Sequence, residues 1–141
     1  MQDPFALQRF VDAQDPVIDR VIDELARGHK SSHWMWFVFP QIAGLGRSAM
    51  AERFAIASLA EARAYLEHPF LGPRLRRCAQ LVNAVEGRSI RDVLGPPDDL
   101  KFRSCMTLFA RATTDNAVFL AALDKYFGGG EDPRTLALIR S

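Results

Sequence analysis

Helix-start and helix-stop signals recur at short intervals along the 141-residue sequence, and they constrain the fold more than any other feature. Asp3-Pro4 and Asp15-Pro16 each combine a capping side chain with a proline suited to the first turn of a helix. These two pairs predict helices over 5–13 and 17–27. Gly28 follows at once, as is typical of a helix end.

The rest of the chain repeats this pattern. Ser58 and Glu61 form a capping box. The helices predicted after position 57 cover 58–67, 69–86, 89–95, 99–112 and 115–127, and a short helical turn follows Asp132-Pro133. Helix 99–112 is apolar around much of its circumference, which predicts a central position.

The apolar run Trp34–Phe39 is the one candidate strand, because its periodicity fits either a strand or a buried helix. Ser31 or Ser32 could cap a helix there and Pro40 could end it, so we predict a short buried helix. No alternating run is flanked by a hairpin dipeptide. We therefore predict one all-α domain over residues 1–141, a compact bundle of about six to eight helices with no sheet.

Composition argues against several classes of protein. A formal net charge of +1 gives no electrostatic reason to expect nucleic acid or a membrane surface as a partner. The sequence begins without a secretory signal and has no apolar run of about 18 residues, so we expect a soluble cytoplasmic protein. Cys78 and Cys105 lie in apolar helical patterns without C-x-x-C spacing, which predicts buried, reduced thiols and no metal site.

The first candidate segment for function runs from Ser31 to Gln41 and contains both tryptophans of the chain, Trp34 and Trp36. His33 precedes them. The aromatic side chains of segment 31–41 cannot all face one side of a helix or strand. Some of them could therefore line a cavity or stack on a planar ligand. The alternative that stays open is that this is simply the densest part of the core.

The second candidate segment is the start of helix 99–112, where Lys101 and Arg103 lie among apolar residues. Cations near a helix N-terminus face an unfavourable dipole and need partners. Asp98 and Asp99 could pair with them in an internal ion network. The alternative is an anion site that combines the two cations with the free N–H groups of the helix.

Several segments together resemble the DUF1810 family of small bacterial and plant proteins. They are Asp3-Pro-Phe-x-Leu-x-Arg-Phe-Val-x-Ala-Gln14, Ser32-His-Trp-Met-Trp-Phe-x-Phe-Pro-Gln41, Gly44-Leu-Gly46, His68-Pro-x-Leu-Gly72 and Asp98-Asp-Leu-Lys-Phe-Arg-Ser104. The resemblance implies an all-α fold, but the family has no known function and no established catalytic residues. A calpastatin role, attached to some members, has no support in this sequence, which lacks protease-inhibitor repeats.

We predict that the protein binds a small anionic or nucleotide-like molecule, without a cofactor. The predicted ligand-binding residues are His33, Trp34, Trp36, Gln41, Asp99, Lys101 and Arg103. The indoles would form walls, Lys101 and Arg103 would contact the anion, and Gln41 and Asp99 would orient the ligand or His33.

His33 is the candidate acid or base, and whether the protein is an enzyme stays open. The alternative function is a non-catalytic helical interaction module, or a homo-oligomeric structural protein. Its binding face would be an exposed aromatic patch formed by Phe37, Phe39 and Phe70.

Overall fold

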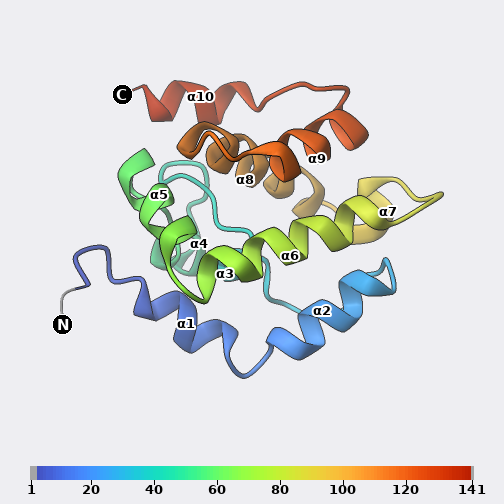
Figure 1. Cartoon of the computed structure of the whole chain (residues 1–141), viewed down its shortest axis with the longest axis horizontal. Helices are drawn as coiled ribbons and strands as arrows, with labels where there is room; N and C mark the ends of the chain where they lie inside the picture. The colour runs from blue at the N-terminus through green and yellow to red at the C-terminus, as the bar shows by residue number, and fades with distance from the viewer. Residues whose placement is uncertain (1–2, 141) are drawn as a thin grey trace.

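The computed structural model describes residues 3–140, which form ten helices and no strand (Figure 1). The helices are α1 (Gln8–Gln14), α2 (Ile18–Ala26), α3 (Met35–Val38), α4 (Ala49–Arg53), α5 (Leu59–Glu67), α6 (Leu71–Ala84), α7 (Ile90–Leu94), α8 (Asp98–Ala112), α9 (Ala117–Phe127) and α10 (Pro133–Ile139). The all-α class is confirmed, including the short helix over the Trp34–Phe39 run.

The number of helices exceeds the six to eight predicted. Helix α4 was not predicted; it begins after Ser48, whose side chain accepts a hydrogen bond from the Ala51 N–H. The segment after Asp132 forms a helix of seven residues rather than a short turn, because Asp132 caps it and Pro133 occupies its first position.

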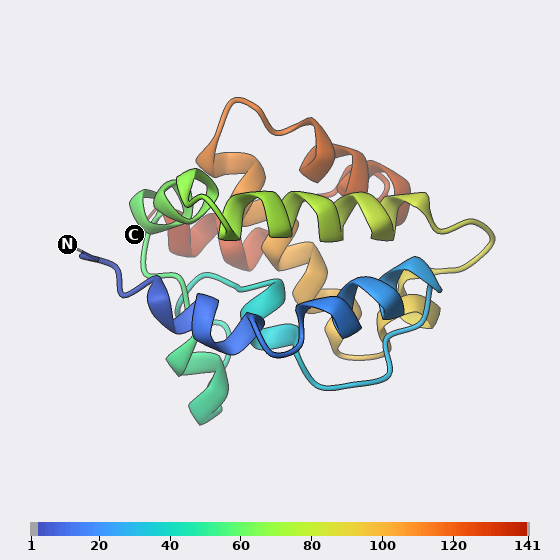
Figure 2. The ribbon, with the colours of Figure 1, turned by 60° about the horizontal axis from the view of Figure 1, so that its bottom comes forward.

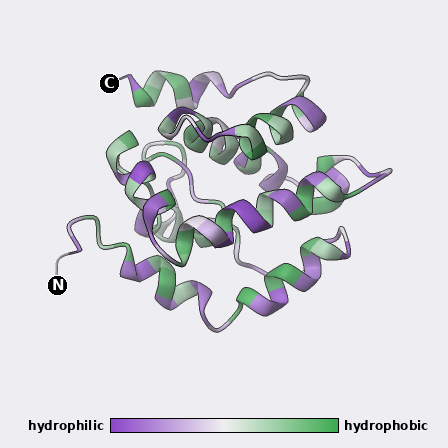
Figure 3. Cartoon of the chain, viewed as in Figure 1, coloured by the Kyte–Doolittle hydropathy of each residue, from purple (hydrophilic) through white to green (hydrophobic). Residues whose placement is uncertain are grey.

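Helix α8 is the central element, as its apolar composition predicts. It packs against α5, α7, α9 and α10. Most of its side chains from Phe102 onward are buried: Phe102, Ser104, Cys105, Met106, Thr107, Leu108, Phe109, Ala110 and Ala112. Figure 2 shows α6 crossing the molecule between α2 on one side and α9 on the other, and α6 contacts both helices. Apolar residues of these helices turn toward this core, and Figure 3 shows them interleaved with polar ones along each ribbon.

Asp15, a predicted cap, and Asp98, the residue before the predicted helix 99–112, bind cations instead of capping helices. Asp15 does not cap α2; its carboxylate lies 2.9 Å from the Arg74 guanidinium of α6. Asp98 lies inside α8 rather than before it, and its carboxylate binds Lys30 at 3.0 Å. In both cases a cation from a distant segment competes with the local backbone N–H groups, which sequence spacing alone does not reveal.

A close approach between helices explains the glycine of the His68-Pro-x-Leu-Gly72 segment. A Cβ atom at Gly72 would lie 2.0 Å from the carbonyl oxygen of Leu66, at the end of the preceding helix. His68 Nδ1 accepts hydrogen bonds from the Phe70 and Leu71 N–H groups at 3.1 and 3.3 Å. The turn from α5 into α6 therefore needs both a small residue and a local acceptor.

The two cysteines lie in the core, as expected. Cys78 and Cys105 are free thiols and almost wholly buried. Burial raises the pKa of the Cys78 thiol to about 12 and that of Cys105 well above its usual value. At neutral pH both are protonated, so neither is a reactive nucleophile.

Candidate functional site

Lys101 lies where three hollows of the surface meet. The aromatic hollow, of about 160 Å³, is lined by Met35, Trp36, Phe39, Gln41, Ile42, Ala43, Gly44, Gly46, Ala51, Glu52, Phe54, Ala55 and Lys101. The cationic hollow, of about 380 Å³, is lined by Gln41, Leu45, Gly46, Pro97, Leu100, Lys101, Arg103, Ser104, Asp132 and Arg134. The histidine hollow, of about 320 Å³, is lined by Lys30, His33, Met35, Trp36, Pro96, Pro97, Asp98 and Lys101. We call these three hollows together the cleft.

Trp36 and Gln41 join these hollows. Helix α3 buries Met35 and Phe37 in the core and leaves Trp36 half-buried between the aromatic and histidine hollows. Gln41 lies between the aromatic and cationic hollows, and its backbone carbonyl accepts a hydrogen bond of 2.9 Å from the Ile56 N–H. Within residues 3–140, neither the Trp36 indole N–H nor the Gln41 side-chain amide has a hydrogen-bond partner. Both are therefore free to bind a ligand.

The ammonium group of Lys101 is only loosely paired. Its Nζ lies 3.8 Å from Asp98 Oδ1 and 5.8 Å from the centre of the Trp36 ring. The same carboxylate is held more closely by Lys30, at 3.0 Å. One aspartate thus serves two lysines, and Lys101 retains most of its capacity to attract an anion.

Trp34 lies away from the cleft, although it is only two residues from Trp36. It is 1% exposed, and its indole N–H donates to Glu24 Oε1 at 3.0 Å. Glu24 also accepts from the Ser31 N–H, the Ser32 N–H and the Ser32 hydroxyl. These four residues are named the Glu24 cluster.

The Glu24 cluster holds a buried carboxylate with neutral donors alone. Burial opposes ionisation of Glu24, but the hydrogen bonds from Ser32, Ser31 and Trp34 outweigh it and lower the pKa to about 2. A buried indole N–H needs an acceptor, and Glu24 supplies it for Trp34. Trp34 is therefore part of the core support behind the cleft rather than one of its walls.

Arg103 lines the cationic hollow while it holds the chain after α9. Its Nε donates to the Gly130 carbonyl at 2.9 Å and its Nη2 to the Glu131 carbonyl at 3.0 Å. These acceptors are neutral, so the guanidinium charge is hydrogen-bonded but is not neutralised by a carboxylate. The internal partners of Arg103 are thus carbonyls, and not the aspartates considered from the sequence.

The other predicted site residues are more scattered. His33 is exposed and lines the histidine hollow, whereas Gln41 lines the other two. Asp99 lines none of the three hollows, and its buried Oδ1 has no hydrogen-bond partner within the described part of the chain. The N–H groups of Asp99, Leu100 and Lys101, in the first turn of α8, donate to the Gly95 and Pro97 carbonyls, so these three are not free to bind an anion. The structure therefore brings Trp36, Gln41, Lys101 and Arg103 together, with His33 at one end.

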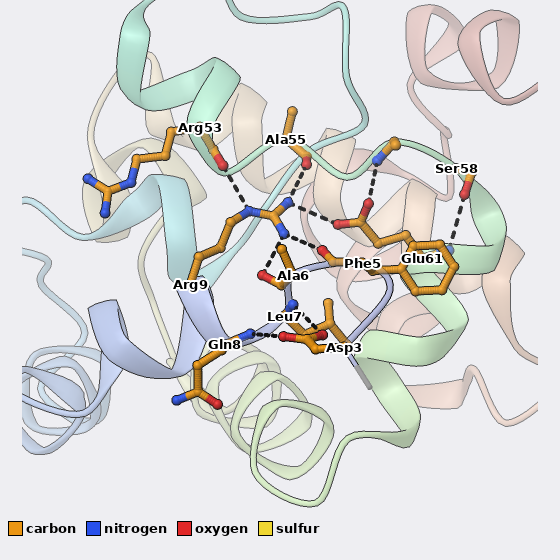
Figure 4. Close-up of polar contacts among 11 residues, drawn as sticks. Asp3, Phe5, Ala6, Leu7, Gln8, Arg9, Arg53, Ala55, Ser58 and Glu61 are labelled. Carbon is orange, nitrogen blue, oxygen red and sulfur yellow. Dashed lines mark hydrogen bonds and ion pairs between the residues drawn. The ribbon is translucent and has the colours of Figure 1, made fainter. Parts of the chain in front are cut away.

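Figure 4 shows a second polar network, formed around Arg9 and Glu61. All five N–H groups of Arg9 are used: they donate to the carbonyls of Phe5, Ala6, Arg53 and Ala55 and to Glu61 Oε2. Glu61 is 3% exposed, and its Oε1 accepts from the Ala57 N–H. Arg9 and Glu61 thus hold segment 53–57, which carries two residues of the aromatic hollow, Phe54 and Ala55.

The sequence did not point to Arg134, which lines the cationic hollow from α10. It is exposed, and its guanidinium forms no hydrogen bond or ion pair with any residue of 3–140. Nor did the sequence identify Glu24 as the acceptor for Trp34. Both residues lie outside the two segments that carried the prediction, and no local spacing connects them to it.

Within residues 3–140, no helix is long and apolar enough to cross a bilayer. No three His, Cys, Asp or Glu side chains in that range are grouped so as to hold a metal ion.

A family model and a solved structure match the chain, and neither description names a function. The conserved hypothetical protein Rv1873 from Mycobacterium tuberculosis, known from a crystal structure, matches with a TM-score of 0.97 and 61% sequence identity over 99% of both chains. No curated protein matches the sequence. The model of the family described as "Protein of unknown function (DUF1810)" matches residues 4–139. The chain therefore belongs to the DUF1810 family of proteins of unknown function.

Proposed function

We propose that the cleft binds a small anionic molecule with a planar group, of the size and character of a nucleotide. The observation that carries this proposal is the position of Lys101. Lys101 lines all three hollows, and the carboxylate nearest to its ammonium group, that of Asp98 at 3.8 Å, is bound more tightly by Lys30. A cation in such a position is available to an anionic ligand.

Two further polar groups converge on the same place. The Trp36 indole N–H and the Gln41 amide have no partner within residues 3–140, and each shares a hollow with Lys101. Trp36 also offers a half-buried ring face for stacking. Unpaired donors beside an aromatic face and a cation are the groups that fix the orientation of a bound planar anion.

The alternative of an aromatic interaction face has less support. Phe37 and Phe39, two members of the expected patch, are 8% and 1% exposed and belong to the core. Phe70 is 56% exposed, so only one of the three rings is on the surface. The predicted patch does not form, and no other observation favours this alternative.

A titration followed by the two tryptophans tests the proposal. AMP is the probe, and the amide and indole N–H signals of ¹⁵N-labelled protein are followed by NMR together with fluorescence. We expect saturable shifts of the Trp36 indole signal, while the Trp34 indole, held by Glu24, serves as an internal reference. Lys101→Met should weaken binding by about tenfold or more, because a charge-assisted hydrogen bond contributes about 1.5–3 kcal/mol.

Arg20→Met is the matched control. Arg20 is an exposed residue of α2 whose guanidinium makes no hydrogen bond or ion pair within residues 3–140. Its replacement should therefore leave AMP binding unchanged. An unshifted Trp36 signal at millimolar AMP would refute the proposal. Equal loss of binding in both variants would instead indicate nonspecific attraction to positive charge.

A further inference from the structure

The aromatic and cationic hollows share a boundary but differ in chemistry. Building on the proposed function, we propose that the ligand is a phosphomonoester of a planar ring, with the ring in the aromatic hollow and the phosphate between Lys101 and Arg134 in the cationic hollow. Arg134 becomes a ligand-binding residue that neither the sequence nor any relative assigns.

The aromatic hollow suits a single ring system. Its floor is formed by core side chains that are almost fully buried, among them Met35, Phe39 and Phe54, so it is held rigidly. Trp36 adds a ring face at its side. Its volume of about 160 Å³ is below the roughly 300–1,000 Å³ of pockets that enclose a whole drug-sized ligand. It therefore accommodates only the flat part of a larger molecule.

The aromatic and cationic hollows differ in the net charge of the residues that line them. The aromatic hollow is lined by one cation, Lys101, and one carboxylate, Glu52, so its lining has no net charge. In the cationic hollow three cations, Lys101, Arg103 and Arg134, face one carboxylate, Asp132. An anion is therefore favoured in the cationic hollow and has no net attraction to the aromatic one.

The single carboxylate of the cationic hollow is already bound within the chain. Asp132 Oδ2 accepts from the Ser104 hydroxyl at 3.0 Å and from the Thr135 N–H at 3.2 Å. Burial opposes its ionisation, but the hydrogen bonds from Thr135 and Ser104 lower its pKa overall. Asp132 stays ionised and stays fixed, so it does not pair with Arg134.

This excess of charge fits a phosphate better than a carboxylate. A phosphomonoester carries about −1.5 to −2 charge at neutral pH and three strong acceptor oxygens. Lys101 and Arg134 each have free donors, and Arg103 adds positive charge although its Nε and Nη2 are bound to carbonyls. A singly charged carboxylate would leave part of this positive charge uncompensated.

The shared wall links the ring to the phosphate. Gln41, Gly46 and Lys101 line both hollows, so a ligand can pass from one to the other beside them. The histidine hollow is the weaker place for the phosphate, because Lys30 is bound to Asp98 at 3.0 Å and to the Ser32 carbonyl at 2.7 Å. Its charge is thus already compensated.

Three probes separate the ring from the phosphate: AMP, adenosine and inorganic phosphate. Each is titrated into the wild-type chain and into Arg134→Met, with Arg140→Met, an exposed cation at the end of the same helix, as the matched control. We expect AMP to bind at least about tenfold more tightly than adenosine or phosphate, since each of these fills only one hollow. Adenosine should shift the Trp36 indole signal, and phosphate should shift the Ser104 amide signal.

Arg134→Met should weaken the binding of AMP and of phosphate by about tenfold and leave the binding of adenosine unchanged. Arg140→Met should leave the binding of all three probes unchanged. The inference is overturned if AMP binding depends on Lys101 but is unchanged in Arg134→Met, and the proposed function then stands. If adenosine binds as tightly as AMP, the phosphate contributes nothing to binding, and the proposed function fails together with the inference. If none of the three probes binds, both the inference and the proposed function fail.

Discussion

Trp34 is the N-cap residue of α3 and Trp36 lies within that helix, yet the two belong to regions that differ in how their polar groups are paired. In the Glu24 cluster, one buried carboxylate accepts four hydrogen bonds at 2.5–3.1 Å. In the cleft, the Trp36 indole and the Gln41 amide have no partner within residues 3–140, and Lys101 has only a distant one. The first region is saturated and the second is open.

This difference separates polar groups that are paired within the fold from polar groups that are left unpaired. A buried carboxylate with every acceptor used stabilises the fold, and its loss leaves donors unsatisfied in the core. Half-buried donors without partners add little to stability and are available to a ligand. Substitutions in the Glu24 cluster should therefore change the free energy of unfolding, whereas substitutions in the cleft should change binding.

The largest loss of stability is expected from Glu24→Gln. The amide keeps the shape but places an N–H₂ group against donors and removes the charge that they bind. The pKa of Glu24 falls from 4.5 to about 2 on folding, which corresponds to about 3 kcal/mol of stability at pH 7. Urea unfolding should show a loss of about that size with an unchanged m-value.

The pH dependence of this effect has a definite sign. Because the folded-state pKa is depressed, the contribution of Glu24 is complete above about pH 5 and is lost as the pH falls toward 2. The gap between the wild type and Glu24→Gln should therefore narrow over that interval. Glu67→Gln is the control, since the side chain of Glu67 is exposed and forms no hydrogen bond or ion pair within residues 3–140. A gap that stays constant with pH would contradict the assignment.

Arg9→Met should be the next most destabilising change. It leaves Glu61, 3% exposed, without its cation and leaves the Arg53 and Ala55 carbonyls without donors. Loss of one partner of a buried ion pair costs about 3–5 kcal/mol, and partial exposure of Arg9 reduces this to about 2–3 kcal/mol. AMP binding should weaken as well, because segment 53–57 carries part of the aromatic hollow. Arg20→Met should change neither quantity by more than about 0.5 kcal/mol.

The sequence predicted the helices well because most of their boundaries are local. Ser58, Ser89 and Asp132 each accept a hydrogen bond from an N–H three residues later, as the spacing predicts. The exceptions are long-range: Asp15 and Asp98 bind cations from other segments instead of capping helices. A side chain that could form either contact adopts the one with a charged partner, and only the fold brings that partner close.

The candidate site was predictable only in part, for the same reason. Trp36, Gln41, Lys101 and Arg103 line adjoining hollows, and unusual polar and aromatic groups in apolar segments marked the two segments that carry them. Their role in ligand binding stays a prediction. Periodicity could not predict which of the two tryptophans is buried, because α3 has only four residues. Arg134 was beyond prediction, since no pattern links α10 to the start of α8 before the chain has folded.

The two tryptophans provide the next sharpest comparison. Trp34→Phe removes volume from a site that is 1% exposed and removes a donor to Glu24, so a loss of about 2 kcal/mol is expected. Trp36→Phe, at a half-buried position with no hydrogen bond to lose within residues 3–140, should change stability by less than about 1 kcal/mol. Thermal and urea unfolding of both variants would measure this. Equal losses would show that Trp36 is as much a core residue as Trp34.

The smallest effects are expected from the two lysines that share Asp98. Lys30 is 8% exposed and binds both Asp98 Oδ2 at 3.0 Å and the Ser32 carbonyl at 2.7 Å, so Lys30→Met should cost about 1 kcal/mol. Lys101 is 29% exposed, and Asp98 keeps its closer partner when Lys101 is replaced. Removal of this cation from the first turns of α8 also relieves an unfavourable interaction with the helix dipole. Lys101→Met should therefore change the free energy of unfolding by less than about 0.5 kcal/mol, while AMP binding falls. A loss of stability equal to that of Lys30→Met would mean that Lys101 belongs to the internal ion network, and the cleft would then have no free cation at the meeting point of its hollows.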